Sequence, residues 1–423
     1  MTLPPDQREY AAQAPPISFL LAFLLAGLML ALKAPDALTN AQFWAQDGAE
    51  FFLAQHGHLL PRAFAPLAGQ FQLLPRLIAW IALPFASVHA PLIYNLAALA
   101  CAAAALASLR KLDAFGLSFA VVLLTLALVP TNGEVFGTLT NLQWLLQFYF
   151  VAMLARLCSG VQDTMVPLLR MMLTAAVALS CPFSMVAAAA VLSAWVWSRS
   201  SAAGAREGVH ATLSPVSGEW LVLALCAGSQ GLAILLNADA AHAAAPAAPA
   251  AFDAYVLFVD SLPAHVFGVP LVTGLLLLTV MLVLVGLALK GAAPRDQAFV
   301  GSFALFAVFE LAATAFRSAA QPGLFLALQD GDRYFLLFKA FFWWLLAFAV
   351  ARRLQRWRSA PLTTILVLLG INAVALSPAL VRRPLVDLHW REHAQRIDAG
   401  ETVDVPINPP PWQFHVQGSR PPP

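Results

Sequence analysis

The sequence predicts an all-α, polytopic transmembrane helix bundle. Of its 423 residues, 60% are hydrophobic and only 11% are charged, and the mean hydropathy is +0.75. Apolar runs of about 15 to 20 residues recur along most of the chain, and a run of this length can cross a bilayer as a helix that satisfies its own backbone hydrogen bonds. The runs do not alternate between polar and apolar residues, which excludes the strands of a membrane barrel.

We expect about eleven spans, with the N-terminus in the cytoplasm. With this orientation the basic residues gather on the inner side, above all in the cluster Arg352, Arg353, Arg356 and Arg358, in agreement with the positive-inside rule. The expected spans lie near residues 15–33, 90–109, 114–130, 141–157, 165–180, 183–198, 218–236, 268–289, 298–315, 335–351 and 360–379.

Residues 70–88 are apolar enough to span but contain Pro75, Arg76 and Pro84. A full span here would place the arginine cluster outside, so we expect a short re-entrant or interfacial helix at 70–88. Irregular backbone at this depth is tolerated where it lines a cavity. We therefore divide the chain into a transmembrane domain at 1–379 and a short, external, Pro-rich tail at 380–423, with one helix from Leu385 to Ala399 followed by extended chain.

Several functional classes are disfavoured by composition and motif. The net charge of +2, without a basic and aromatic patch, gives no reason to expect a nucleic-acid partner. The chain has no Walker loop, no Rossmann glycine pattern and no GxSxG elbow. The cysteines fall in or beside apolar runs and form no CxxC pair, so we interpret them as buried structural thiols: Cys101, Cys158, Cys181 and Cys226.

The most distinctive polar segment, residues 43–52, directly follows the first span. Asp47 and Glu50 lie three residues apart and would share one face of a helix. Further polar side chains gather at the span ends that this topology places outside. Such one-sided polarity favours an enzyme of the outer leaflet over a transporter, which more often places charge near the bilayer midplane.

The order of these polar segments along the chain resembles the GT-C superfamily of integral-membrane glycosyltransferases, in a bacterial, largely uncharacterised branch. The segments are Trp44–Glu50, Gln70–Leu77, Thr140–Trp144, Gly331–Tyr334 and Val405–Trp412. The resemblance implies sugar transfer from a polyprenyl-phosphate carrier to an envelope glycan, lipid or protein. It also implies a bacterial inner-membrane location with a periplasmic active site. The chain departs from many members in lacking two adjacent acids in the first loop and a large soluble external domain.

By this similarity, Asp47 would be the general base, with Glu50 beside it. A carboxylate at an apolar membrane edge is a better base because its charged form is disfavoured. Negative charge on the departing phosphate would be balanced by Arg317 and Arg333, with Arg76 as a third candidate. The remaining expected substrate-binding residues are Asn141, Gln143 and Trp144 for the sugar, and Asp332 and Tyr334 beside the carrier.

Each role has a structural alternative. Asp47 could cap or solvate an interfacial helix, and Glu50 could simply face water. Arg333 could pair with Asp330 or Asp332, and Arg76 could snorkel to the interface. Glu310, the only acid well inside an expected span, could pair with Arg317. A divalent metal at Asp47, His56 and His58 is a weak alternative, and we expect no metal or cofactor. Two other functions remain open, a transporter or flippase of a lipid-linked saccharide and a non-catalytic membrane scaffold.

Overall fold

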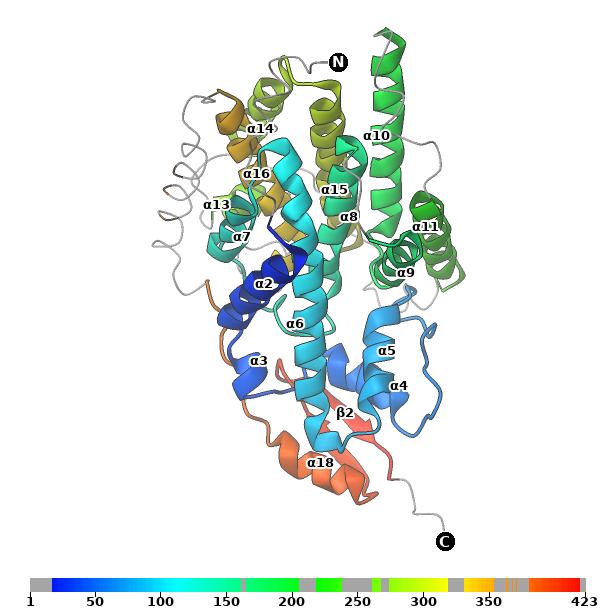
Figure 1. Cartoon of the computed structure of the whole chain (residues 1–423). Coiled ribbons are helices and arrows are strands. Elements are labelled where there is room, and N and C mark those ends of the chain that lie inside the picture. Colours follow the sequence, from blue (N-terminus) through cyan, green and yellow to red (C-terminus); the bar gives the residue numbers. More distant parts are fainter. Residues whose placement is uncertain are drawn as a thin grey trace.

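The computed structural model describes residues 17–160, 165–204, 218–237, 261–267, 274–318, 331–353 and 380–418, with three single residues between 363 and 370. Within these ranges the chain is mostly helical, which confirms the predicted helical class (Figure 1). Nearly all of the expected span at 360–379 lies outside the described residues.

Every other expected span overlaps a helix. The pairs α2 and α6, and α10 and α15, pack closely against each other. The helices are α2 (Phe19–Lys33), α6 (Ala90–Ser108), α7 (Phe119–Leu128), α8 (Gln143–Ser159), α9 (Pro167–Ala178), α10 (Ser184–Gly204), α11 (Gly218–Leu236), α14 (Gly274–Leu289), α15 (Pro294–Ser318) and α16 (Leu336–Arg353).

Helix ends follow local sequence signals. The side chain of Ser18 accepts a hydrogen bond from the Leu21 amide at the start of α2, and Ser118 does the same for Val121 at the start of α7. Helix α8 ends at Gly160, whose positive φ of 66° suits a residue without a Cβ. These caps explain why the helices begin and end close to the limits of the apolar runs.

Four helical stretches in the described ranges are long and apolar enough to cross a bilayer: Ser87–Phe115, Gly218–Leu236, Pro294–Ala313 and Asp332–Arg352. They favour membrane association. The ten residues of α7 extend only about 15 Å, half of a hydrocarbon core of roughly 30 Å. The number of spans therefore remains a prediction.

The ambiguous segment at 70–88 contains the ten-residue helix α5 (Leu73–Ala82), followed by a 3₁₀ turn, η2 (Ser87–His89), that leads into α6. A helix of this length is too short to cross a bilayer by itself. The start of α5 is tied to the turn after α9, because the Leu74 amide donates to Ser180 Oγ at 2.7 Å. The segment is thus held by its neighbours in the bundle.

The tail is more structured than the sequence indicated. Its helix α18 (Trp390–Asp398) begins five residues later than expected, and the chain beyond it forms an antiparallel hairpin of β1 (Val403–Pro406) and β2 (Gln413–Val416) instead of extended chain. Two short strands are therefore added to the helical fold. The hairpin packs at the lower end of the molecule in Figure 1, where the Ala45 amide donates to the Asn408 carbonyl at 2.6 Å.

Candidate functional site

The segment that carries both candidate acids forms a π-helix, η1 (Asp47–Phe52), followed by the short helix α4 (Leu53–Gln55). Within this turn the two acids differ in burial. Asp47 is fully buried, whereas Glu50 is half-buried. The two acids therefore have different environments. Short π-helical turns often occur at functional sites. Just before this turn, Ala45 has a φ of 44°, a strained conformation for a residue with a Cβ.

The Asp47 carboxylate is held by the loop formed by residues 131–142. The Thr140 amide and hydroxyl lie 2.7 and 2.6 Å from Oδ1, and the Leu139 amide donates to Oδ2 at 3.3 Å. Burial raises the pKa of Asp47 to about 6, although these hydrogen bonds and the charge of Arg382 act in the opposite direction. Asp47 is thus a carboxylate of increased basicity that remains mostly ionised at neutral pH.

Arg382, at the start of the segment predicted to be an external tail, is buried beside this loop. Its Nε donates to Asp36 Oδ1 at 3.2 Å, and its Nη1 donates to the Phe136 carbonyl at 2.7 Å. Asp36 opens the short helix α3 (Asp36–Thr39). In the sequence, Arg382 stands out as a charged residue in a largely apolar chain. Its partner Asp36 could not be predicted, because it lies 346 positions away.

The same loop reaches a second group of candidate residues through Glu134. The Nη1 of Arg333 donates to Glu134 Oε1 at 2.7 Å, and the guanidinium lies 5.0 Å from the ring centroid of Tyr334. The ion pair considered for Arg333 therefore forms with Glu134 and not with Asp332; Asp330 lies outside the described residues. About a quarter of the Arg333 side chain, 23%, stays accessible.

Asp332 has a different environment from the neighbouring Arg333. It opens the 3₁₀ turn η7 (Asp332–Phe335) and is fully buried. Its Oδ1 lies 2.6 Å from Lys339 Nζ and 2.5 Å from Nδ1 of His265, on helix α13 (Leu262–Phe267), and its Oδ2 accepts from the Asn132 amide at 2.9 Å. These partners engage both oxygens and support Asp332 as an anchor of the fold.

The expected sugar-binding residues lie at the start of α8. Asn141 is buried and donates from its side-chain amide to the Glu134 carbonyl at 2.9 Å, while Gln143 accepts from Gln72 at 3.3 Å. The Trp144 ring lies 5.1 Å from that of Tyr334, and its Nε1 has no hydrogen-bond partner among the described residues. Trp144, Tyr334 and Arg333 therefore form one contiguous group.

Arg76 lies on α5 and contacts the π-helix. Its Nη1 donates to the Glu50 carbonyl at 3.0 Å, and its guanidinium lies 5.3 Å from the ring centroid of Phe51. The side chain is buried, so it does not snorkel, and burial lowers its pKa. Its Nε has no hydrogen-bond partner in the described part of the chain, which leaves one donor for another ligand.

Three further expectations concern Arg317, Glu310 and a metal. Arg317 belongs to α15, but its side chain lies outside the described residues, and so does any pairing with Glu310. Among the residues that the structure describes, no group of three or more His, Cys, Asp or Glu side chains could hold a metal ion.

The structure therefore gathers the candidate residues into two groups joined by the 131–142 loop. The first contains Asp47, Glu50 and Arg76, and the second contains Arg333, Tyr334 and Trp144. Comparison with family models, curated proteins and solved structures gave no match to the chain.

Proposed function

We propose that this protein is a membrane glycosyltransferase of the GT-C type. It would move a sugar from a polyprenyl-phosphate carrier to an envelope glycan, lipid or protein at the external membrane face. The observation that carries this proposal is the Asp47 carboxylate, which is buried, of raised basicity and fixed by Thr140.

Asp47 has the properties of a general base for an acceptor hydroxyl. A base works best when its pKa lies near the working pH, and the pKa of Asp47 is raised to about 6. An ionised carboxylate offers about four acceptor positions, and the hydrogen bonds from Thr140 and Leu139 use three. The remaining position on Oδ2 would take the proton as the acceptor oxygen attacks the anomeric carbon.

Access to Asp47 requires movement of the tail hairpin in this proposal. The Phe414 ring packs so closely over the π-helix that a Cβ added to Gly48 would lie 2.7 Å from it. Displacing β2 would open the segment to the acceptor. Glu50, which is half-buried, would then orient the acceptor beside the base.

Positive charge for the departing phosphate would come from Arg76 and Arg333. Arginine suits this role because its planar guanidinium donates two parallel hydrogen bonds to phosphate oxygens. Arg76 has an unpartnered buried Nε among the described residues, and Arg333 keeps part of its surface accessible. Trp144 and Tyr334 offer aromatic faces beside Arg333 for a sugar ring.

The proposal includes the predicted membrane arrangement. About eleven spans would lie in a bacterial inner membrane, with the N-terminus in the cytoplasm and both groups of candidate residues in the periplasm. The bilayer and the lipid-linked donor would be partners, and nucleic acid would not.

The test is glycan and lipid profiling of cell envelopes that contain the wild-type protein, no protein, Asp47→Asn, or the control Asp113→Asn. Asp113 is a half-buried acid outside both groups, in the 3₁₀ turn η3 (Leu109–Phe115). We expect the null and Asp47→Asn cells to lose the same sugar modification, while inserted Asp113→Asn protein retains it.

Two outcomes would replace the proposal. If Asp47→Asn behaves as wild type while the null accumulates a lipid-linked intermediate, the protein is a transporter or flippase of that saccharide. If Asp47→Asn, Asp47→Ala and Arg333→Ala all leave the envelope unchanged although the null does not, the protein is a scaffold.

A further inference from the structure

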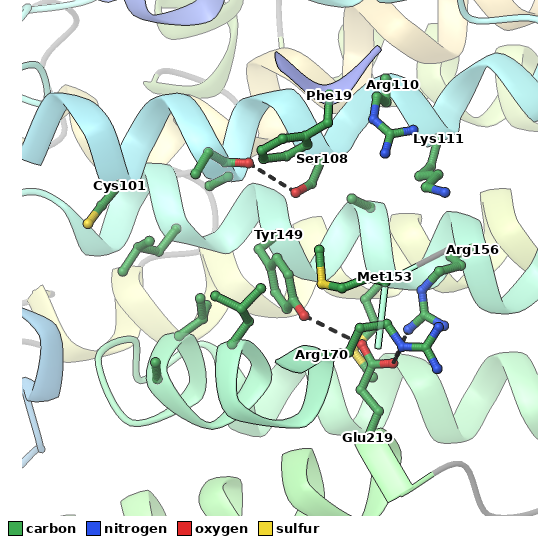
Figure 2. Close-up of a pocket in the computed structure, with 18 of the residues that line it drawn as sticks. Phe19, Cys101, Ser108, Arg110, Lys111, Tyr149, Met153, Arg156, Arg170 and Glu219 are labelled. Atoms are coloured by element: carbon green, nitrogen blue, oxygen red, sulfur yellow. Dashed lines mark hydrogen bonds and ion pairs between the residues drawn. The ribbon is translucent and has the colours of Figure 1, made fainter. Parts of the chain in front are cut away.

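A cavity of about 190 Å³ lies among α6, α8 and α9, apart from both groups of candidate residues. One of its ends is basic and the rest is apolar, as Figure 2 shows, with Cys101 at the apolar end. The apolar wall includes Ala104, Leu146, Met153, Leu173 and Val177.

The basic end combines basic residues from three elements. Arg110 and Lys111 come from η3, Arg156 from α8 and Arg170 from α9, and all four lie at the same side of Figure 2. They face a single lining carboxylate, that of Glu219 at the start of α11. The three lining arginines therefore outnumber the lining carboxylate by two positive charges.

Glu219 engages only part of this basic group. It forms ion pairs with Arg156 and, at 3.8 Å, with Nε of Arg170, and it accepts from Thr174 at 3.3 Å. Nε of Arg110 is buried without a hydrogen-bond partner among the described residues, and its guanidinium lies 5.7 Å from the Phe19 ring centroid. A buried donor without a partner is costly unless a ligand or water satisfies it.

We propose that this cavity binds an anionic phospholipid of the surrounding bilayer, with its phosphate among Arg110, Arg156 and Arg170 and an acyl chain along the apolar wall. Basic pockets between membrane helices favour anionic head groups, and guanidinium groups match phosphate oxygens in geometry. The apolar wall favours a lipid over a soluble phosphate, and the charge surplus favours an anionic lipid over a zwitterionic one. In the proposed topology this is the cytoplasmic leaflet, and the inference does not depend on sugar transfer.

The test is native mass spectrometry of detergent-purified full-length protein after titration with phosphatidylglycerol, phosphatidylcholine or inorganic phosphate. The variant Arg110→Gln/Arg170→Gln removes two bases and leaves the Arg156–Glu219 pair intact. Its control, Lys290→Gln/Arg295→Gln, removes two exposed bases, one just after α14 and one in the first turn of α15. A third variant, Ala104→Phe, narrows the apolar part and keeps every charge.

We expect wild type and control to bind one phosphatidylglycerol in strong preference to phosphatidylcholine. The two-base variant should bind it about 30-fold more weakly, since each base near an anionic lipid contributes roughly fivefold. Ala104→Phe should also weaken lipid binding, which no effect of charge alone would produce. Equal binding of the two lipids, equal loss in the control, or inorganic phosphate binding as tightly as the lipid would overturn the proposal.

Discussion

Buried charged side chains are paired differently at the two ends of this molecule. At the end that carries the tail, three acid–base pairs tie distant segments together, whereas at the basic end of the cavity three arginines share one lining carboxylate, that of Glu219. Because a buried charge is expensive unless it is paired, the pairs at the first end hold loops in place and the surplus at the second end favours an anionic ligand. The tail-end pairs are Asp332–Lys339, Glu134–Arg333 and Asp36–Arg382.

The largest expected effect comes from removing Asp332. Asp332→Ala would leave Lys339 and His265 buried without their carboxylate, and breaking a buried pair in this way costs about 3–5 kcal/mol. We expect a large drop in the thermal unfolding temperature of the detergent-purified protein. Asp332→Leu combined with Lys339→Met should recover most of the loss, because it removes both charges. A double variant as unstable as the single one would show that the pair is not what stabilises this end.

Next in size is the pair that fixes the tail. Arg382→Met leaves Asp36 unpaired and removes the hydrogen bond to Phe136, so we expect destabilisation of about 3 kcal/mol. Its neighbour Arg383 is exposed, and Arg383→Met is a matched control that should change stability by less than about 0.5 kcal/mol. Limited proteolysis of the tail would separate the two, with faster cleavage expected only for Arg382→Met. Equal cleavage would mean that the Arg382 contacts do not hold the tail.

Asp47 provides a smaller effect that depends on pH. Its pKa is about 6 in the folded protein against 3.8 for an unperturbed group, so the folded state binds the proton more readily than the unfolded state. The wild type should therefore gain about 1 kcal/mol of stability relative to Asp47→Asn between pH 7 and pH 5. Unfolding temperatures of both proteins across this range would measure it. A difference that stays constant with pH, or that shrinks for wild type on acidification, would contradict the raised pKa.

The helices of the bundle could be predicted because the sequence signals that define them are local. Apolar runs of helical length, together with caps such as Ser18, Ser118 and Gly160, determine where helices begin and end. A charge-based argument also anticipated that residues 70–88 contain only a short helix, and α5 has ten residues.

The arrangement of the candidate site was not predictable in this way. The π-helical turn places Asp47 and Glu50 in different environments, and a period of 3.6 residues gives no sign of it. The pairs Glu134–Arg333 and Asp36–Arg382 join residues 199 and 346 positions apart, and pairing over such distances depends on tertiary packing. The hairpin was not predicted because its prolines indicated extended chain. What the sequence did identify is the set of polar segments that meet at the tail end, although their roles stay predictions.

The smallest effect on stability is expected at the basic end of the cavity, and it completes the comparison. Arg110→Gln removes a cation without a paired carboxylate among its described contacts. In lipid-free detergent its free energy of unfolding should therefore match that of wild type to within about 1 kcal/mol. Added phosphatidylglycerol should then stabilise wild type more than the variant, because a ligand that binds only the folded state stabilises it in proportion to occupancy. Phosphatidylcholine should stabilise both equally. If Arg110→Gln instead unfolds as readily as Asp332→Ala, the cations at this end hold the fold together as the pairs at the other end do, and the contrast between the two ends disappears.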